Sequence, residues 1–264
     1  FEAAVVDADA LIIRSDKVTP EVIAAANNLK IVVRAGAGYD NVDLDAATSK
    51  GIVVMNTPGQ NANAVAELAL GMMVYLARNG FNGKAGTELR GKTLGIHAFG
   101  NVGRDVARIA RGFGMDVFAF DPFIEDEVIR AEGVIPVGSV EELYSQCQYV
   151  SLHIPANEKT RGSINRDLLV RMPEGAVLVN TARKEVVCEE SLLEIFRKRP
   201  DFKYVSDVAP DCKDEIAAQF AGRFFFTPKK MGAQTTEANI NAGLAAIRQI
   251  IAFLEDGNRT FQVN

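Results

Sequence analysis

A glycine-rich stretch, residues 93–103, is the part of the chain whose residue types and spacing point most directly to chemistry. It reads TLGIHAFGNVG, after a short apolar run and before a helix-like pattern. Glycine suits such a turn because the backbone must approach a pyrophosphate there, and the following helix N-terminus offers free N–H donors. Ala98 replaces the first glycine of the G-x-G-x-x-G pattern. The stretch predicts a dinucleotide-binding turn with contacts from Phe99, Gly100, Asn101, Val102 and Gly103, and a plain tight strand–helix turn is the alternative.

Asp121 ends the next apolar run, 21 residues after Gly100. An acid at this spacing accepts hydrogen bonds from the adenosine ribose hydroxyls and repels a 2′-phosphate. The alternative is that Asp121, which precedes a proline, only starts a turn. Together, the glycine-rich stretch and Asp121 favour NAD over NADP.

A second candidate site begins at Arg34, which ends an apolar run and is followed by Ala35, Gly36, Ala37 and Gly38. Glycines in such a loop leave backbone N–H groups able to hold a carboxylate. The alternative role for the arginine is a surface ion pair. We therefore expect this loop to bind an anionic substrate.

Two further arginines follow apolar runs. Arg14 suits a phosphate, because a guanidinium makes paired, charge-assisted hydrogen bonds to oxyanions. Arg183 comes just after a strand-like run, at the sheet edge where α/β proteins bind ligands. A surface ion pair for Arg14 and a solvent-facing position for Arg183 are the alternatives.

The elements that position these residues alternate between short apolar runs and helical patterns, which indicates an α/β fold with parallel sheets. We expect strands at 10–14, 31–34, 53–56, 93–98, 116–121, 149–154, 176–180, 204–207 and 224–227. We expect helices at 20–28, 44–50, 62–78, 102–113, 140–147, 165–171, 191–198 and 235–255.

The composition excludes several classes of protein. The net charge of −5 argues against general nucleic-acid binding, and the sequence lacks an apolar run of about 18 residues that would span a membrane. The three cysteines are odd in number and widely spaced, which argues against a disulfide framework or a zinc cluster and fits the reducing cytoplasm. We therefore expect a cytoplasmic protein without a metal site.

The chain resembles the D-isomer-specific 2-hydroxyacid dehydrogenases over almost its whole length. The most telling blocks are residues 12–15, 33–43, 55–59, 65–67, 91–95, 152–155, 179–183 and 231–238. The contexts of Arg14 and Arg34 favour the branch of the family that acts on 3-phosphoglycerate.

The resemblance implies a Rossmann-type NAD domain at 66–239 and a smaller, flavodoxin-like substrate domain at 1–65 and 240–264. It implies NAD-dependent oxidation of D-3-phosphoglycerate to 3-phosphohydroxypyruvate, the first step of L-serine biosynthesis, by a homodimer paired through the region 62–91. Arg183 becomes the substrate-orienting arginine, and Asp207 the aspartate that meets the nicotinamide carboxamide. Further cofactor contacts are implied for Pro155, Thr160, Thr181 and Ala182.

The chain departs from the family at the acid/base. The family uses a histidine in a Thr-Pro-His segment and a glutamate five residues after the strand-end aspartate, whereas here residues 227–232 read TPKKMG and the glutamate position is Cys212. We expect a lysine to replace the histidine, with its pKa lowered by burial and by Arg183. Lys230 is preferred and Lys229 stays open, as does the supporting acid among Asp211, Asp214 and Glu215. His97 and His153 are expected to be structural.

Two other functions remain as alternatives. The chain could be a dehydrogenase of another D-2-hydroxy acid, of the glyoxylate/hydroxypyruvate type, or a non-catalytic protein that senses NAD(H). Family members begin with a further strand and helix, so we also expect that residues before Phe1 complete the first sheet.

Overall fold

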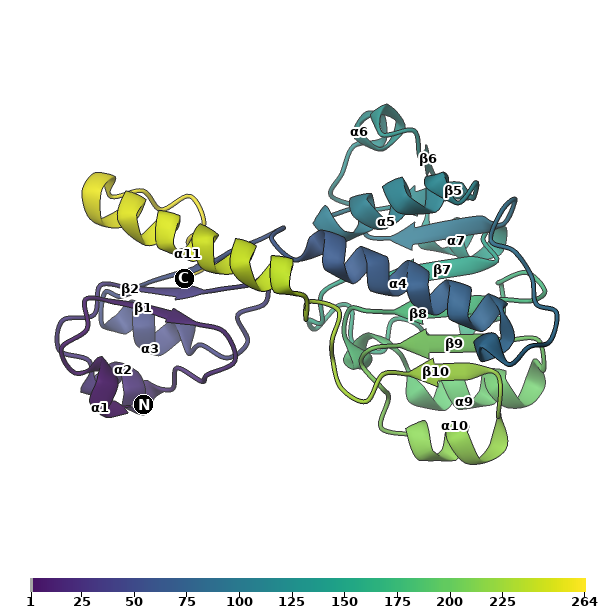
Figure 1. Cartoon of the computed structure of the whole chain (residues 1–264), viewed down its shortest axis with the longest axis horizontal. Helices are drawn as coiled ribbons and strands as arrows, with labels where there is room; N and C mark the ends of the chain where they lie inside the picture. Colours follow the sequence, from purple (N-terminus) through teal and green to yellow (C-terminus); the bar gives the residue numbers. More distant parts are fainter. Residues whose placement is uncertain (1) are drawn as a thin grey trace. The chain divides into compact units, whose positions relative to one another are not determined.

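The computed structural model describes residues 2–264, which form two α/β units (Figure 1). Unit 1 combines the chain up to Ala62 with Ala233–Asn264, and unit 2 is Asn63–Gly232. The chain crosses between the units twice, so unit 1 is assembled from two separate stretches of sequence. The predicted α/β class, with two parallel-sheet units, is confirmed.

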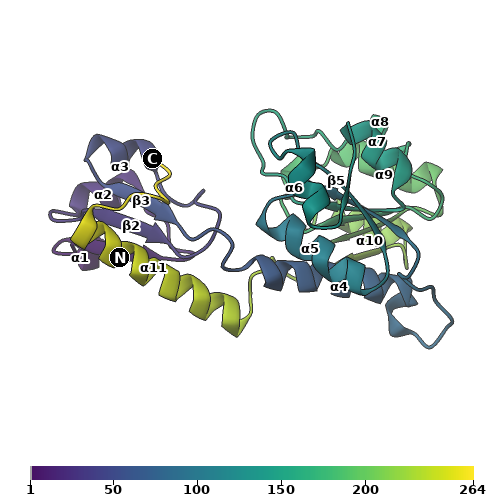
Figure 2. The ribbon, with the colours of Figure 1, turned by 90° about the horizontal axis from the view of Figure 1, so that it is seen from above.

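Unit 1 holds a three-stranded parallel sheet in the order β1-β2-β3. Helices α2 and α3 cover one face of this sheet and α11 covers the other (Figures 1 and 2). The strands are β1 (Ala10–Ile13), β2 (Ile31–Arg34) and β3 (Val53–Asn56). The helices are α1 (Glu2–Val5), α2 (Pro20–Ala25), α3 (Leu44–Ser49) and α11 (Thr236–Asp256).

The register of this sheet places the predicted anion-binding residues side by side. Arg34, the last residue of β2, is paired with Ile13 on one side and with Asn56 on the other. Because all three strands run parallel, Arg14 and the loop after Arg34 leave the same carboxyl edge. Both faces of β2 are buried, which explains its unbroken apolar run before Arg34.

Unit 2 holds a seven-stranded parallel sheet in the order β10-β9-β8-β7-β4-β5-β6. Its strands are β4 (Thr93–His97), β5 (Asp116–Phe120), β6 (Ile135–Pro136), β7 (Tyr149–Leu152), β8 (Val177–Asn180), β9 (Lys203–Ser206) and β10 (Phe224–Phe226). The strand order reverses between β4 and β7, and open α/β sheets bind ligands at such a switch point, beyond the carboxyl ends of the strands.

The helices of unit 2 cover both faces of its sheet (Figures 1 and 2). They are α4 (Ala62–Ala77), α5 (Asn101–Gly112), α6 (Asp126–Ala131), α7 (Val140–Gln146), α8 (Arg166–Leu169), α9 (Glu189–Lys198) and α10 (Lys213–Gln219), with the 3₁₀ turns η1 (Asn79–Phe81) and η2 (Lys184–Val186). Three short elements of unit 2, β6, α6 and α10, were not expected from the sequence, because none of them shows a clear hydrophobic period.

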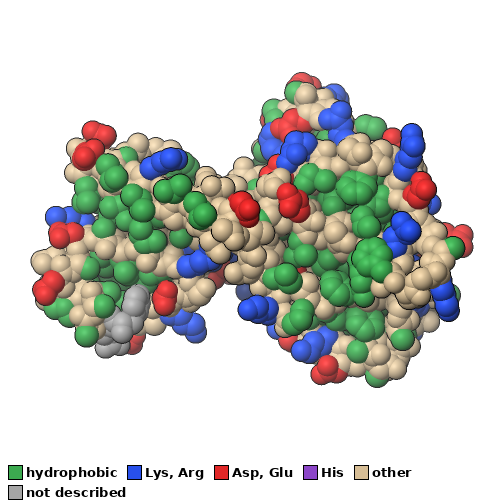
Figure 3. Space-filling model, in the orientation of Figure 1, with side chains coloured by type: hydrophobic (Ala, Val, Ile, Leu, Met, Phe, Trp, Pro, Cys, Tyr) green, Lys and Arg blue, Asp and Glu red, His purple; other side chains and the backbone are tan. Residues whose placement is uncertain are grey.

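Helix α11 also presents an apolar stripe to solvent, visible over unit 1 in Figure 3. The stripe consists of Ile240, Leu244, Ile247, Ile251 and Leu254, which are each between 46% and 55% exposed. The opposite side of the helix buries Ala242 and Ala246 against the sheet. No helix within residues 2–264 is long and apolar enough to cross a lipid bilayer.

Candidate functional site

The glycine-rich turn links β4 to α5 as predicted, and its two glycines have different roles. A Cβ at Gly103 would lie 2.3 Å from the Ala98 carbonyl oxygen, so only glycine lets α5 approach the strand this closely. A Cβ at Gly100 would meet nothing within 4 Å, so that side of the turn is open. Gly100 is the N-cap of the 12-residue helix α5, and no side-chain cap occupies the first N–H groups of this helix. Such an arrangement fits a pyrophosphate.

Asp121 follows β5 and lies against the turn. Its carboxylate accepts a hydrogen bond from the Phe99 N–H at 2.8 Å and another from the Phe123 N–H at 2.9 Å. A carboxylate offers about four acceptor positions, so it retains capacity for ribose hydroxyls. The structure thus brings Asp121 and the glycine-rich turn together, as the spacing predicted.

Arg104 is part of this turn and was missed by the sequence analysis. Its Nε donates to the Phe99 carbonyl at 3.1 Å, its guanidinium lies 5.1 Å from the Phe99 ring centroid, and it forms an ion pair with Glu132. Phe99 itself is fully buried, so it shapes the turn rather than exposing its ring. An arginine in the first turn of a helix carries no distinctive sequence signal.

The loops after β7 and β8 leave the same edge of the sheet. The Thr160 hydroxyl donates to the Pro155 carbonyl, which joins two of the predicted cofactor contacts within one loop. Asn180, which is fully buried at the end of β8, accepts from the Ala182 N–H at 3.0 Å and donates to the Arg183 carbonyl at 2.9 Å. Asn180 therefore shapes the loop that carries Arg183, a role the sequence analysis did not assign.

Asp207 follows β9 and is 1% exposed. Its Oδ2 accepts from the N–H groups of Met231 (3.2 Å) and Gly232 (2.7 Å). Burial raises the pKa of Asp207, while these two hydrogen bonds and the positive charges of Lys230 and Arg183 oppose the rise. Its carboxylate therefore holds the backbone that directly follows the two candidate lysines.

Two buried oxygens near this edge have no hydrogen-bond partner among residues 2–264: Asp207 Oδ1 and Thr181 Oγ1. Leaving a buried polar atom unpaired costs about 1–3 kcal/mol, so such atoms call for an explanation. An amide or hydroxyl of a bound cofactor would supply the missing partner. Together with the open side of Gly100 and the acid at Asp121, these two atoms fit a nicotinamide dinucleotide.

Arg183 and Lys230 meet at one oxygen. Arg183 Nη1 donates to the Ala182 carbonyl at 2.9 Å, and Lys230 Nζ lies 3.5 Å from the same oxygen. Lys229 instead offers its backbone carbonyl to the Thr227 hydroxyl at 2.7 Å. The structure therefore brings the Lys230 side chain beside the predicted substrate-orienting arginine. Lys230 is exposed, however, so the burial expected around it is not present.

Two of the three acids considered as support for the lysine have other partners. Asp211 forms an ion pair with Lys184 at 2.5 Å, and Glu215 forms one with Arg197 at 2.5 Å. Asp214 is exposed. The buried carboxylate whose pKa responds to the charge of Lys230 is Asp207, which the sequence analysis had assigned only to the cofactor.

In unit 1, the Arg34 guanidinium lies directly over Gly36. Gly36 has a φ of +149°, and a Cβ there would be only 1.6 Å from Arg34 Nη1. The expectation that the loop glycines free their N–H groups is wrong at this position. The Ala35 N–H donates to the Ile13 carbonyl and the Gly36 N–H to the Arg34 carbonyl, both at 2.8 Å. Gly36 instead makes room for the arginine.

The remainder of this loop is held by the end of β3. Asn56 Nδ2 donates to the Ala37 carbonyl at 2.7 Å, and the Thr57 N–H donates to the Gly36 carbonyl at 3.0 Å. Gln249 of α11 in turn donates to the Asn56 carbonyl at 3.0 Å. Ala37 and Gly38 are the loop positions whose N–H groups remain candidates for an anion.

Arg14 leaves the neighbouring strand end. Its Nη2 donates to the Ala233 carbonyl at 3.1 Å, in the segment that leads into α11. Asn41 supports the Arg14 backbone, since its Nδ2 donates to the Arg14 and Asp16 carbonyls at 3.4 and 2.6 Å. Arg14 and Arg34 thus share the carboxyl edge of the unit 1 sheet.

The two histidines expected to be structural lie in surroundings that disfavour their charged forms. Burial lowers the pKa of His97 to about 4, and its Nδ1 lies 3.4 Å from the Tyr144 hydroxyl. Burial and then the charge of His97 lower the pKa of His153 to about 3. Both imidazoles are therefore neutral at pH 7.

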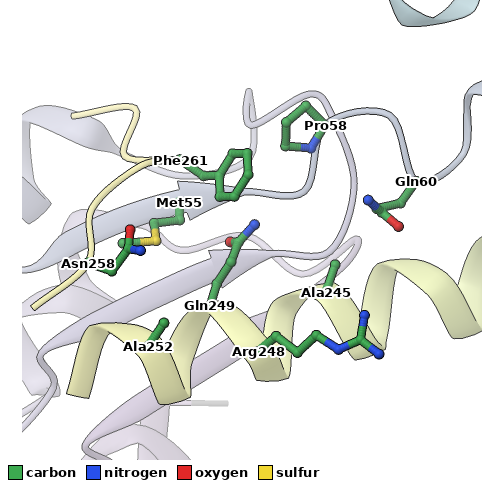
Figure 4. Close-up of a pocket in the computed structure, with 9 residues that line it drawn as sticks. All are labelled: Met55, Pro58, Gln60, Ala245, Arg248, Gln249, Ala252, Asn258 and Phe261. Atoms are coloured by element: carbon green, nitrogen blue, oxygen red, sulfur yellow. The ribbon is translucent and has the colours of Figure 1, made fainter. Parts of the chain in front are cut away.

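A separate pocket of about 250 Å³ lies in unit 1 between β3, α11 and the C-terminal segment (Figure 4). Met55 and Phe261 form part of its apolar wall, and Arg248 and Gln249 extend from α11. None of the predicted site residues lines it. Within residues 2–264, no group of three or more His, Cys, Asp or Glu side chains is arranged to hold a metal ion.

The family described as "D-isomer specific 2-hydroxyacid dehydrogenase, NAD binding domain" matches residues 72–221. The chain is 38% identical over 266 residues to a hydroxypyruvate reductase of Thermotoga maritima, covering 92% of this chain and 84% of that protein. It is 37% identical over 260 residues to a D-3-phosphoglycerate dehydrogenase of Methanocaldococcus jannaschii, covering 92% of this chain but only 49% of that protein.

Among solved structures, the chain is similar to an NAD⁺-bound 3-phosphoglycerate dehydrogenase of Entamoeba histolytica, with a TM-score of 0.91 and 49% sequence identity. The match covers all of this chain and 84% of that one. The matching part of the family lies within unit 2, which also contains the glycine-rich turn, Asp121 and Asp207.

Proposed function

The chain belongs to the D-isomer-specific 2-hydroxyacid dehydrogenase family, and on this premise we infer that it oxidises D-3-phosphoglycerate to 3-phosphohydroxypyruvate. This family consists of NAD-dependent dehydrogenases, and unit 2 contains its NAD-binding domain. The observation that carries the inference is the convergence of Arg183 and Lys230 on the Ala182 carbonyl, beside buried Asp207. The reaction would open a route to L-serine.

Bound NAD would be held by the turn 98–103, Asp121, Thr181 and Asp207, and it supplies the hydride acceptor. Lys230, as the acid/base, would take the proton from the C2 hydroxyl as the hydride leaves C2. Arg183 pairs with the substrate carboxylate and the C2 oxygen, which orients the substrate and polarises the C–O bond. In the reverse direction, protonated Lys230 returns the proton to that oxygen.

The choice of a phosphorylated substrate rests on unit 1. Arg14 and Arg34 leave one edge of the same sheet, and two guanidinium groups there suit an anion of high charge. The chain as a whole carries a net charge of −5, so these local cations must overcome a repulsive background. A substrate with an uncharged hydroxymethyl group in place of the phosphate would form no ion pair with these two arginines.

The test is NADH formation from D-3-phosphoglycerate and NAD at alkaline pH. The Lys230→Ala variant should lose about 10²–10⁴-fold in kcat while still binding NADH. The Lys229→Ala variant is the matched control, because it removes the positive charge next to Lys230 and keeps the contact between Lys230 and the Ala182 carbonyl. It should retain most activity. If Lys229→Ala abolishes turnover and Lys230→Ala does not, the assignment is reversed.

The second candidate function is reduction of hydroxypyruvate or glyoxylate. It is favoured by the Thermotoga maritima relative, named hydroxypyruvate reductase, of which the chain covers 84%. The ratio of kcat/KM for 3-phosphohydroxypyruvate to that for hydroxypyruvate decides between them. If the protein binds NADH but turns over no small 2-hydroxy or 2-oxo acid, a role in sensing NAD(H) replaces both.

The homodimer implied by the family resemblance stays a prediction. Its expected region, residues 62–91, carries Phe81, which is 65% exposed and lies edge-on to Tyr75 with ring centroids 5.4 Å apart. Light scattering coupled to gel filtration would test for the dimer, and Phe81→Ser should weaken it.

A further inference from the structure

The second crossing between the units lies between Gly232 and Ala233, and the backbone is held on both sides of it. Before the crossing, the Asp207 carboxylate accepts from the Met231 and Gly232 N–H groups. After it, the Ala233 carbonyl accepts from Arg14 Nη2 at 3.1 Å. These three successive residues also follow Lys230 directly in the sequence.

We propose that Arg14 is a positioning residue for Lys230 and not only a ligand for the substrate's phosphate. Its hydrogen bond to Ala233 restrains the backbone three residues after the lysine. This inference rests on the proposed acid/base role of Lys230. The inference links anion binding to the backbone that follows Lys230, because Arg14 would contribute to both.

The chemistry of arginine allows this double role. A guanidinium has five N–H donors in a rigid plane, and the Ala233 carbonyl is bonded to Nη2. Its remaining donors can hold an oxyanion at the same time. An anion bound to Arg14 orients the guanidinium and so strengthens its hold on Ala233.

The backbone around the hydrogen bond between Arg14 and Ala233 is held by further contacts. Ala233 precedes the N-cap of α11, Thr235, whose hydroxyl accepts from the Ala238 N–H at 3.1 Å, so the chain is anchored again two residues later. Arg14 is itself half-buried and its backbone is held by Asn41. The backbone from Met231 to Thr235 therefore has a defined path, and the Arg14 contact at Ala233 lies within it.

The first test compares two substrates in the Arg14→Met variant, with Arg130→Met as the matched surface control. Arg130 lies on α6 and pairs only with the exposed acids Asp126 and Glu127 in the described contacts. If Arg14 only binds phosphate, its loss raises KM for 3-phosphohydroxypyruvate and leaves glyoxylate reduction unchanged. The positioning role instead lowers kcat for glyoxylate, which has no phosphate, by about tenfold or more.

The second test does not depend on catalysis. Hydrogen exchange is measured by mass spectrometry in the peptide that covers residues 228–239. Exchange should be faster in Arg14→Met than in wild type, and inorganic phosphate should slow it in wild type alone. Arg14→Lys, which keeps the charge but not the fork, should restore part of the phosphate affinity and little of the protection.

The outcomes separate the two proposals. Unchanged glyoxylate kcat together with unchanged exchange in Arg14→Met overturns the positioning role, whatever the enzyme's substrate. Altered exchange in a protein that turns over no 2-oxo acid would keep the Arg14 coupling and remove the proposed dehydrogenase activity. Melting curves of both variants establish that they are folded before either comparison is made.

Discussion

The Ala98→Gly substitution should stabilise the protein, because Ala98 is held at a φ of +82° in the cofactor turn. An L-residue in this region pays about 1–2 kcal/mol relative to its preferred conformations, and glycine does not. Glycine also gives the unfolded chain more backbone entropy, which lowers the stabilisation by about 0.5–1 kcal/mol. Ala98 packs partly on the apolar core, so losing its methyl costs a further few tenths of a kcal/mol.

The net gain is therefore about 0.5 kcal/mol and at most about 1 kcal/mol, which corresponds to roughly 1–4 °C in Tm for a domain of this size. Thermal unfolding measures it directly, and urea unfolding at constant slope provides an independent value. The control is Ala217→Gly, the same exchange at an exposed position inside α10, which should destabilise by about 0.5–1 kcal/mol.

Opposite signs for the two variants would support the strained turn. If Ala98→Gly lowers Tm as much as Ala217→Gly does, the turn does not hold residue 98 at positive φ. NAD affinity should be measured in parallel, because a more flexible turn pays more entropy when it orders around a pyrophosphate.

Gly36→Ala should raise KM for the phosphorylated substrate at least tenfold, since the new Cβ would take the place of the guanidinium it faces; steady-state kinetics with an unchanged KM would contradict this. Gly103→Ala should lower the free energy of unfolding, measured in urea, by about 2 kcal/mol or more and should weaken NADH binding. The control is Gly112→Ala, in the same helix with open space around it, which should leave the free energy of unfolding unchanged or raise it. Burial lowers the folded-state pKa of His97 to about 4 and that of His153 to about 3, below the ordinary value of about 6.5. The free energy of unfolding should therefore be highest above about pH 6.5 and fall as the pH drops, by about 1.4 kcal/mol per pH unit per histidine. A free energy of unfolding that stays constant between pH 7 and 5 would rule this out.

Much of the fold could be predicted because strands buried on both faces appear as unbroken apolar runs. All nine expected strands are present, and the glycine-rich turn with Asp121 lies where the spacing placed it. The short elements α6 and β6 could not be found, since neither spans enough residues to show a period.

The arrangement of the site was less predictable, because it depends on contacts between residues far apart in the sequence. Nothing in the local pattern shows that the Gly36 N–H is occupied or that the Arg34 guanidinium fills the space above it. The choice between Lys229 and Lys230 likewise depends on which lysine side chain reaches the Ala182 carbonyl, 48 residues away in the sequence from Lys230.

The division of unit 1 between two stretches of sequence has a consequence for synthesis on the ribosome. One face of its sheet, which includes Ile31, Val33 and Met55, is covered by Ala242 and Ala246 of α11. Those residues are translated only after the whole of unit 2. During that interval the unfinished face is a binding surface for chaperones, while the continuous unit 2 can fold as it emerges. Slowing translation within unit 2 should therefore prolong the time during which the chain binds chaperones, without changing the structure of the finished enzyme.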